Sequence, residues 1–130
     1  MKPIDPSKAK GYITKSEEFL EMSKSAYETG KYTSAVTNAI HSAINALDAL
    51  TTSYLRQRSS GQHDNVLSLI KGIFTPDEYT AISTQFNSLL SLKNASEYQP
   101  DLMKAPDAVN SIKHAERILS KVNAKIQGKI

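Results

Sequence analysis

Hydrophobic side chains follow a helical period most clearly between residues 32 and 57. One stripe, at steps of four and three residues, consists of Val36, Ile40, Ala43, Leu47, Leu50 and Tyr54. A stripe of small residues runs beside it and consists of Ala35, Ala39, Ser42, Ala46 and Ala49. Such spacing places each stripe on one face of an α-helix. A helix apolar over so wide an arc is expected at the centre of a bundle, with neighbours on at least two sides.

Two more long helices are expected near the ends of the chain. Ser7 is a candidate N-cap for a helix that runs to about Thr29, and the following Gly30 is typical of a helix C-terminus. The last helix is expected from Pro106, because hydrophobic residues continue from there to Ile126 at steps of three and four.

The remaining segment predicts a short helix over residues 63–72 and then a fourth long helix. Thr75 can cap the fourth helix, Pro76 fits its first position and Glu78 completes a capping box. Pro100 marks its end. No strand-like alternation is present, so the fold class is all-α: an antiparallel up-and-down bundle of four long helices plus one short helix.

Length, cysteine content and net charge limit the classes of protein to which this chain can belong. The 130 residues predict a single domain over residues 1–130, with a core at about 8–126 and a short flexible N-terminal tail. The absence of cysteine excludes disulfides, thiolate catalysis and zinc–thiolate sites. There is no signal-peptide-like or membrane-spanning run, so a cytoplasmic protein with no membrane partner is expected. The net charge of +3 is below that of a dedicated nucleic-acid binder.

The fourth helix ends in a polar cluster that is the strongest candidate for a site. This Lys93–Tyr98 cluster consists of Lys93, Asn94, Glu97 and Tyr98. Lys93 continues the apolar seam that includes Leu89, and polar groups at the edge of a core are costly unless they are paired or hydrated. The cluster can hold a phosphate or ribose, with charge from Lys93 and hydrogen bonds from Asn94. Equally, it can cap the helix, with Lys93 paired to Glu97 and Tyr98 covering the core.

The last helix carries a basic ridge at steps of four residues. The ridge consists of Lys113, Arg117, Lys121, Lys125 and Lys129. It can track phosphates, and binding would then depend on salt. The alternative is a solvated face with cations near a helix C-terminus. We favour that alternative, because no aromatic residue is interleaved for base stacking.

The three histidines, His41, His63 and His114, lie far apart in the sequence. None has a carboxylate or another histidine at the spacing of metal ligands on a helix. We therefore expect no metal and no cofactor, and we interpret His41 as a structural residue that is partly buried and hydrogen-bonded.

The whole chain from about residue 8 to 126 resembles a prokaryotic HEPN domain. The resemblance lies in the order of six segments: Glu18–Leu20, Gly30–Tyr32, Ala35–Ala43, Gly61–His63, Leu92–Tyr98 and the amphipathic helix Ala108–Ile126. It implies a small helical bundle, usually dimeric and often encoded beside a minimal nucleotidyltransferase as a toxin–antitoxin pair. The wide apolar arc of the central helix also favours a homodimer.

Many HEPN domains are metal-independent endoribonucleases that use an arginine, a following polar residue and a histidine four to six positions after the arginine. In this sequence Lys93 stands in place of the arginine, Asn94 matches the polar residue and Tyr98 stands where the histidine is expected. Lysine lacks arginine's planar fork, and a phenol is protonated at pH 7. We therefore expect a binding module, associated with a nucleotide or RNA and with a nucleotidyltransferase-type partner. The alternatives are a degenerate RNase that uses Lys93, Asn94 and Tyr98, and a purely structural domain.

Overall fold

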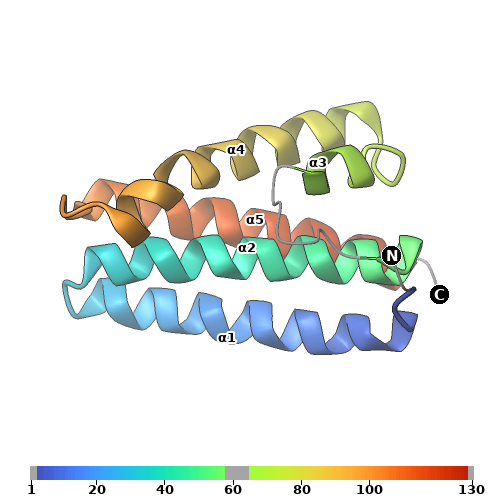
Figure 1. The fold of residues 1–130 in the computed structure, drawn as a ribbon, viewed down its shortest axis with the longest axis horizontal. Helices are drawn as coiled ribbons and strands as arrows, with labels where there is room; N and C mark the ends of the chain where they lie inside the picture. The colour runs from blue at the N-terminus through green and yellow to red at the C-terminus, as the bar shows by residue number, and fades with distance from the viewer. Residues whose placement is uncertain (1–2, 58–64, 129–130) are drawn as a thin grey trace.

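The computed structural model describes residues 3–57 and 65–128, and within them every regular element is helical. The elements are η1 (Pro6–Lys8), α1 (Ala9–Glu28), α2 (Tyr32–Leu55), α3 (Asn65–Ile70), α4 (Pro76–Tyr98) and α5 (Ala105–Gly128). Four are long and α3 is short, which confirms the all-α prediction. Consecutive long helices run in opposite directions, so that α2 and α5 point the same way (Figure 1). No helix of the described residues is long and apolar enough to cross a membrane.

The helix ends follow the sequence signals with one exception. Gly30 has a φ of +74°, and the N–H of Lys31 donates to the carbonyl of Ala26 at 2.8 Å, as expected where a glycine ends a helix. Thr75 and Glu78 form the expected capping box. Ser7, however, does not cap the first helix.

The capping residue is Asp5 instead of Ser7. Asp5 is the N-cap of η1, and its carboxylate accepts a hydrogen bond from the N–H of Ser7 at 3.0 Å. Pro6 then occupies the first position of η1, and α1 follows from Ala9 without a side-chain cap. In the segment expected to be a short flexible tail, the N–H of Ile4 donates to the carbonyl of Arg56 at 2.8 Å. His63, expected at the start of the short helix, lies outside the described residues.

The helix α2 is at the centre of the bundle and contacts η1 and every other α-helix, as its pattern predicts. Its small-residue stripe is fully buried. Ser16 of α1 and Ser42 of α2 each donate a hydroxyl to the other's carbonyl, at 2.7 and 2.8 Å. Seven residues away on each helix, Ser23 donates to the carbonyl of Ala35 at 2.6 Å. These bonds join α1 and α2 along an antiparallel seam of small residues, the α1–α2 seam.

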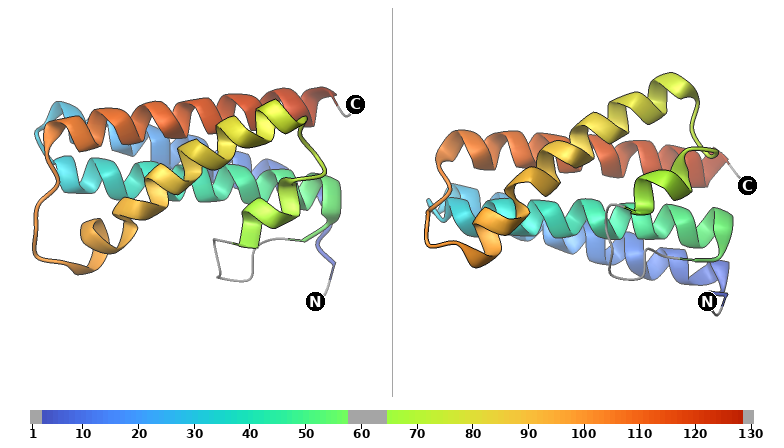
Figure 2. Two further views of the ribbon diagram at one scale, coloured as in Figure 1. Left: turned by 90° about the horizontal axis from the view of Figure 1, so that it is seen from above. Right: turned by 45° about the horizontal axis from the view of Figure 1, so that its top comes forward.

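The helix α4 crosses the bundle obliquely (Figure 2). Ile82, Phe86 and Leu89 are fully buried on its inner face, and α4 contacts both α2 and α5. This packing brings the last turns of α4 across α2, where the Lys93–Tyr98 cluster lies.

Candidate functional site

Glu97 lies at the centre of the candidate site. Its side chain is only 12% exposed, and its Oε2 atom accepts from the ammonium of Lys93 at 2.8 Å. The pair spans one turn of α4, a spacing that places the two side chains next to each other. Thus Lys93, which follows the apolar seam, is stabilised at the edge of the core by a carboxylate.

The ion pair changes the pKa of both partners. Burial alone would raise the pKa of Glu97, but the hydrogen bond and charge of Lys93, together with smaller contributions that include a hydrogen bond from Tyr98, hold that pKa below its ordinary value. The same hydrogen bond raises the pKa of Lys93. Both groups are therefore charged at neutral pH, and each charge compensates the other.

His41 of α2 reaches the same carboxylate from the opposite side. Its Nε2 atom lies 3.0 Å from Oε1 of Glu97, and its ring packs against Phe19 of α1 with ring centroids 5.4 Å apart. Oε1 is buried, and among the described residues no donor is aligned with it as a hydrogen bond requires, despite the short distance to His41. The site therefore combines residues of three helices. Phe19 of α1 packs against His41 of α2, and His41 in turn lies next to Glu97 of α4.

From the sequence we interpreted His41 as a partly buried, hydrogen-bonded structural residue, and this interpretation did not include the contact with Glu97. A signal was present: polar residues recur along α2 at steps of four and three, beside its apolar stripes. They are Ser34, Asn38, His41, Asn45 and Asp48. These positions lie on a face of α2 that is more exposed than its apolar stripes, although Asp48 at one end of it is buried. Only the fold shows that α4 places Glu97 against this face.

The other two members of the Lys93–Tyr98 cluster face outward. Tyr98 is 72% exposed, so it does not cover the core. Its ring centroid lies 5.5 Å from the ammonium of Lys93, within the range of a cation–π contact. Asn94 is also exposed. The cluster thus has an inner ion pair and an outer phenol and amide that are accessible to a ligand.

The residues of the basic ridge differ in exposure and in pairing. Lys113 and Arg117 are exposed, whereas Lys125 pairs with Glu78 of α4 at 3.0 Å and lies 5.5 Å from the ring centroid of Phe74. One end of the ridge therefore binds α4, and Lys129 lies outside the described residues. Burial, followed by the charge of Arg117, lowers the pKa of His114 beside the ridge.

No three His, Cys, Asp or Glu side chains gather into a possible metal site within residues 3–57 and 65–128.

The chain is similar to a known protein family and to a solved structure. The family model of the HEPN domain matches residues 9–125. Among solved structures, the crystal structure of TT1696 from Thermus thermophilus is similar, with a TM-score of 0.72 and 18% sequence identity. The similarity covers 91% of this chain and 98% of that chain, and at this identity it concerns the fold. A search of curated proteins finds no match.

Proposed function

Because the chain belongs to the HEPN domain family, we propose that it is a nucleotide- or RNA-associated binding module. In this proposal it acts as a homodimer with a nucleotidyltransferase-type partner in a toxin–antitoxin-type pair. The proposed binding role is supported by the two parts of the Lys93–Tyr98 cluster, an inner ion pair and two outer residues. Its cation is held by Glu97, while Tyr98 and Asn94 face solvent.

The outer residues fit recognition of an unpaired nucleotide. An exposed aromatic ring can stack on any base, and a carboxamide both donates and accepts hydrogen bonds. Lys93 supports a nearby phosphate only weakly, because Glu97 compensates its charge. The exposed ridge cations Lys113 and Arg117 are available for further phosphate contacts.

Binding of fluorescent single-stranded RNA and of nucleotides at several salt concentrations tests this proposal. We expect weak binding that falls steeply with salt, since counterion release drives phosphate contacts. Tyr98→Ala should weaken binding about tenfold, within the range of a lost stacking contact. Tyr27→Ala, at another partly exposed tyrosine, is the matched control. Equal binding by both variants, or binding insensitive to salt, would contradict the proposal.

A second candidate function is metal-independent RNA cleavage, and the position of His41 favours it. Its imidazole lies 3.0 Å from Glu97 and its side chain is 38% exposed, so a proton acceptor is present although Tyr98 replaces the expected histidine. In such a reaction the base removes the proton of a 2′-hydroxyl. The 2′-oxygen attacks the adjacent phosphorus, the bond to the 5′-oxygen breaks, and the 5′-oxygen takes a proton from water, giving a 2′,3′-cyclic phosphate and a 5′-hydroxyl.

Incubation of the purified protein with RNA in EDTA distinguishes the two functions. The binding module predicts no cleavage by the wild type. Cleavage that disappears in both His41→Ala and Lys93→Ala, but persists in His114→Ala, would establish the nuclease in place of the simple binding module. If the protein neither binds nor cleaves RNA or nucleotides, the cluster only caps α4.

A further inference from the structure

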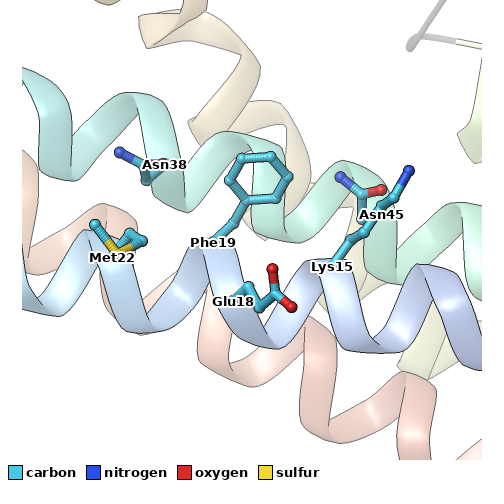
Figure 3. A pocket seen from close by; sticks show the side chains of 6 residues that line it. All are labelled: Lys15, Glu18, Phe19, Met22, Asn38 and Asn45. Carbon is cyan, nitrogen blue, oxygen red and sulfur yellow. The ribbon is translucent and has the colours of Figure 1, made fainter.

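A groove of about 510 Å³ runs along the outside of α1 and α2 and contains no residue of the Lys93–Tyr98 cluster. Phe19, which lines it, also packs against His41. Its lining residues are Lys15, Glu18, Phe19, Met22, Asn38 and Asn45. In Figure 3, Lys15 and Asn45 lie together at one end, Met22 and Asn38 at the other, and the ring of Phe19 between them. This volume is within the range of small-molecule sites.

The α1 side of the groove carries two opposite charges that do not pair. Lys15 and Glu18 are three residues apart on α1, a spacing at which an ion pair commonly forms. Yet within the described residues neither side chain has an ion-pair partner. An exposed cation and an exposed anion, three residues apart on α1, are thus both available to a ligand.

The amides of the α2 wall are held in place by their own helix. Asn38 donates to the carbonyl of Ser34 and Asn45 donates to the carbonyl of His41, each at 2.8 Å. One N–H and the oxygen of each carboxamide remain for a ligand. Both therefore present one donor and one acceptor on fixed side chains.

The charges exclude the simplest ligands. A phosphate or other plain anion would meet Glu18, and a plain cation would meet Lys15. A ligand that carries both charges satisfies both groups at once. Beside them, Phe19 and Met22 form an apolar wall, and Met22 is 57% exposed, so the side chain of a ligand can cover it.

From this arrangement we propose that the groove binds a free α-amino acid with an apolar side chain. The carboxylate of the amino acid lies at Lys15 and the N–H of Asn45, its ammonium at Glu18, and its side chain against Phe19 and Met22. A residue within a polypeptide lacks both charges and a chain terminus has only one of them, so the ligand is the free amino acid. The proposal is independent of RNA or nucleotide binding.

The proposal is tested by titrating the full chain, labelled with ¹⁵N, with L-leucine and L-methionine and following the side-chain amide signals of Asn38 and Asn45. We expect shifts that saturate below about 10 mM. N-acetyl-L-leucine lacks the ammonium and L-leucinamide lacks the carboxylate. Each should bind about tenfold more weakly than L-leucine, as expected when one charged contact is lost.

Matched variants separate the groove from the rest of α1. Lys15→Met and Glu18→Gln should each weaken L-leucine binding about tenfold. Lys10→Met and Glu17→Gln, at exposed positions outside the groove, should leave it unchanged. The proposal is overturned if neither amino acid produces saturable shifts, if the blocked derivatives bind equally well, or if the control variants lose binding to the same degree. RNA or nucleotide binding in the same samples reports separately on the proposed function.

Discussion

Glu97 connects two helices through one carboxylate, with Lys93 on one oxygen and His41 near the other. The spacing of Lys93 and Glu97 on one helix made their pairing visible in the sequence. The contact with His41 was not visible, because it depends on where α4 crosses α2. Local pairs can be predicted from spacing along a helix, whereas pairs between distant segments require the packing angle of the helices.

The ion pair of Glu97 makes the stability of the protein depend on pH. The pKa of Glu97 is lowered in the folded state, so its contribution is present above its ordinary value of 4.5 and is lost as the pH falls through the lower folded-state pKa. Glu97→Gln should therefore reduce the free energy of unfolding at pH 7 by about 1–2 kcal/mol. The difference between wild type and variant should shrink as the pH falls below 4.5.

Chemical denaturation at a series of pH values measures this difference. Glu17→Gln, an exposed position on α1, is the control and should change stability by less than about 0.5 kcal/mol at every pH. A constant difference between wild type and Glu97→Gln from pH 7 to pH 3 would show that the lost charge is not responsible.

At the scale of elements, the small-residue stripe of α2 packs against α1 along the α1–α2 seam. The sequence predicted a closely packed neighbour for this face of α2, and the structure identifies it as α1. Ser16 and Ser23 could not be assigned to the seam beforehand, because serine is also common on exposed helix faces. Their role depends on the antiparallel register, which brings them opposite Ser42 and Ala35.

Enlarging a seam residue should separate the two helices. Ser42→Leu places a large side chain where Ser16 and Ser42 exchange hydrogen bonds. It also removes one of the hydroxyls, so unfolding should become easier by about 2–4 kcal/mol. Ser34→Leu, on the exposed side of the same helix, should have little effect. Thermal unfolding of both variants measures the difference, and comparable melting temperatures would argue against close packing at Ser42.

At the scale of the whole molecule, one argument for a homodimer fails. The sequence reasoning was that α2 is apolar over more arc than a single bundle needs to cover. In the structure both of its stripes are covered within one chain, except that Tyr54 is half-buried. Helix patterns reveal how much surface must be buried, but not whether the same chain buries it. The large hydrophobic side chains left exposed are found elsewhere, and Tyr98 and Leu102 are the most exposed of those described.

We still expect a homodimer, now through the segment between α4 and α5 that carries Leu102, with Tyr98 left accessible to a ligand. Leu102 is 80% exposed in the segment between α4 and α5. Light scattering at micromolar concentration should give a mass near twice the 14.3 kDa of the chain. Leu102→Asp should shift the population toward the monomer, because it places a charge in an apolar contact.

Leu55→Asp, at a position 37% exposed near the end of α2, is the control for the dimer. A wild type that remains at the monomer mass throughout a dilution series would contradict the homodimer. Dissociation of both variants to the same extent would place the contact away from Leu102.

The α1–α2 seam also restricts how the molecule can move. The hydroxyl-to-carbonyl bonds of Ser16, Ser23 and Ser42 join the two helices at one register, so sliding one helix along the other would break these bonds together. The two helices are therefore held at one register. The helix α4 packs on α2 through buried apolar side chains and brings Glu97 within 3.0 Å of His41. His41 lies on one of the two joined helices and Glu97 on α4, so the angle at which α4 crosses them sets the distance between the imidazole and the carboxylate.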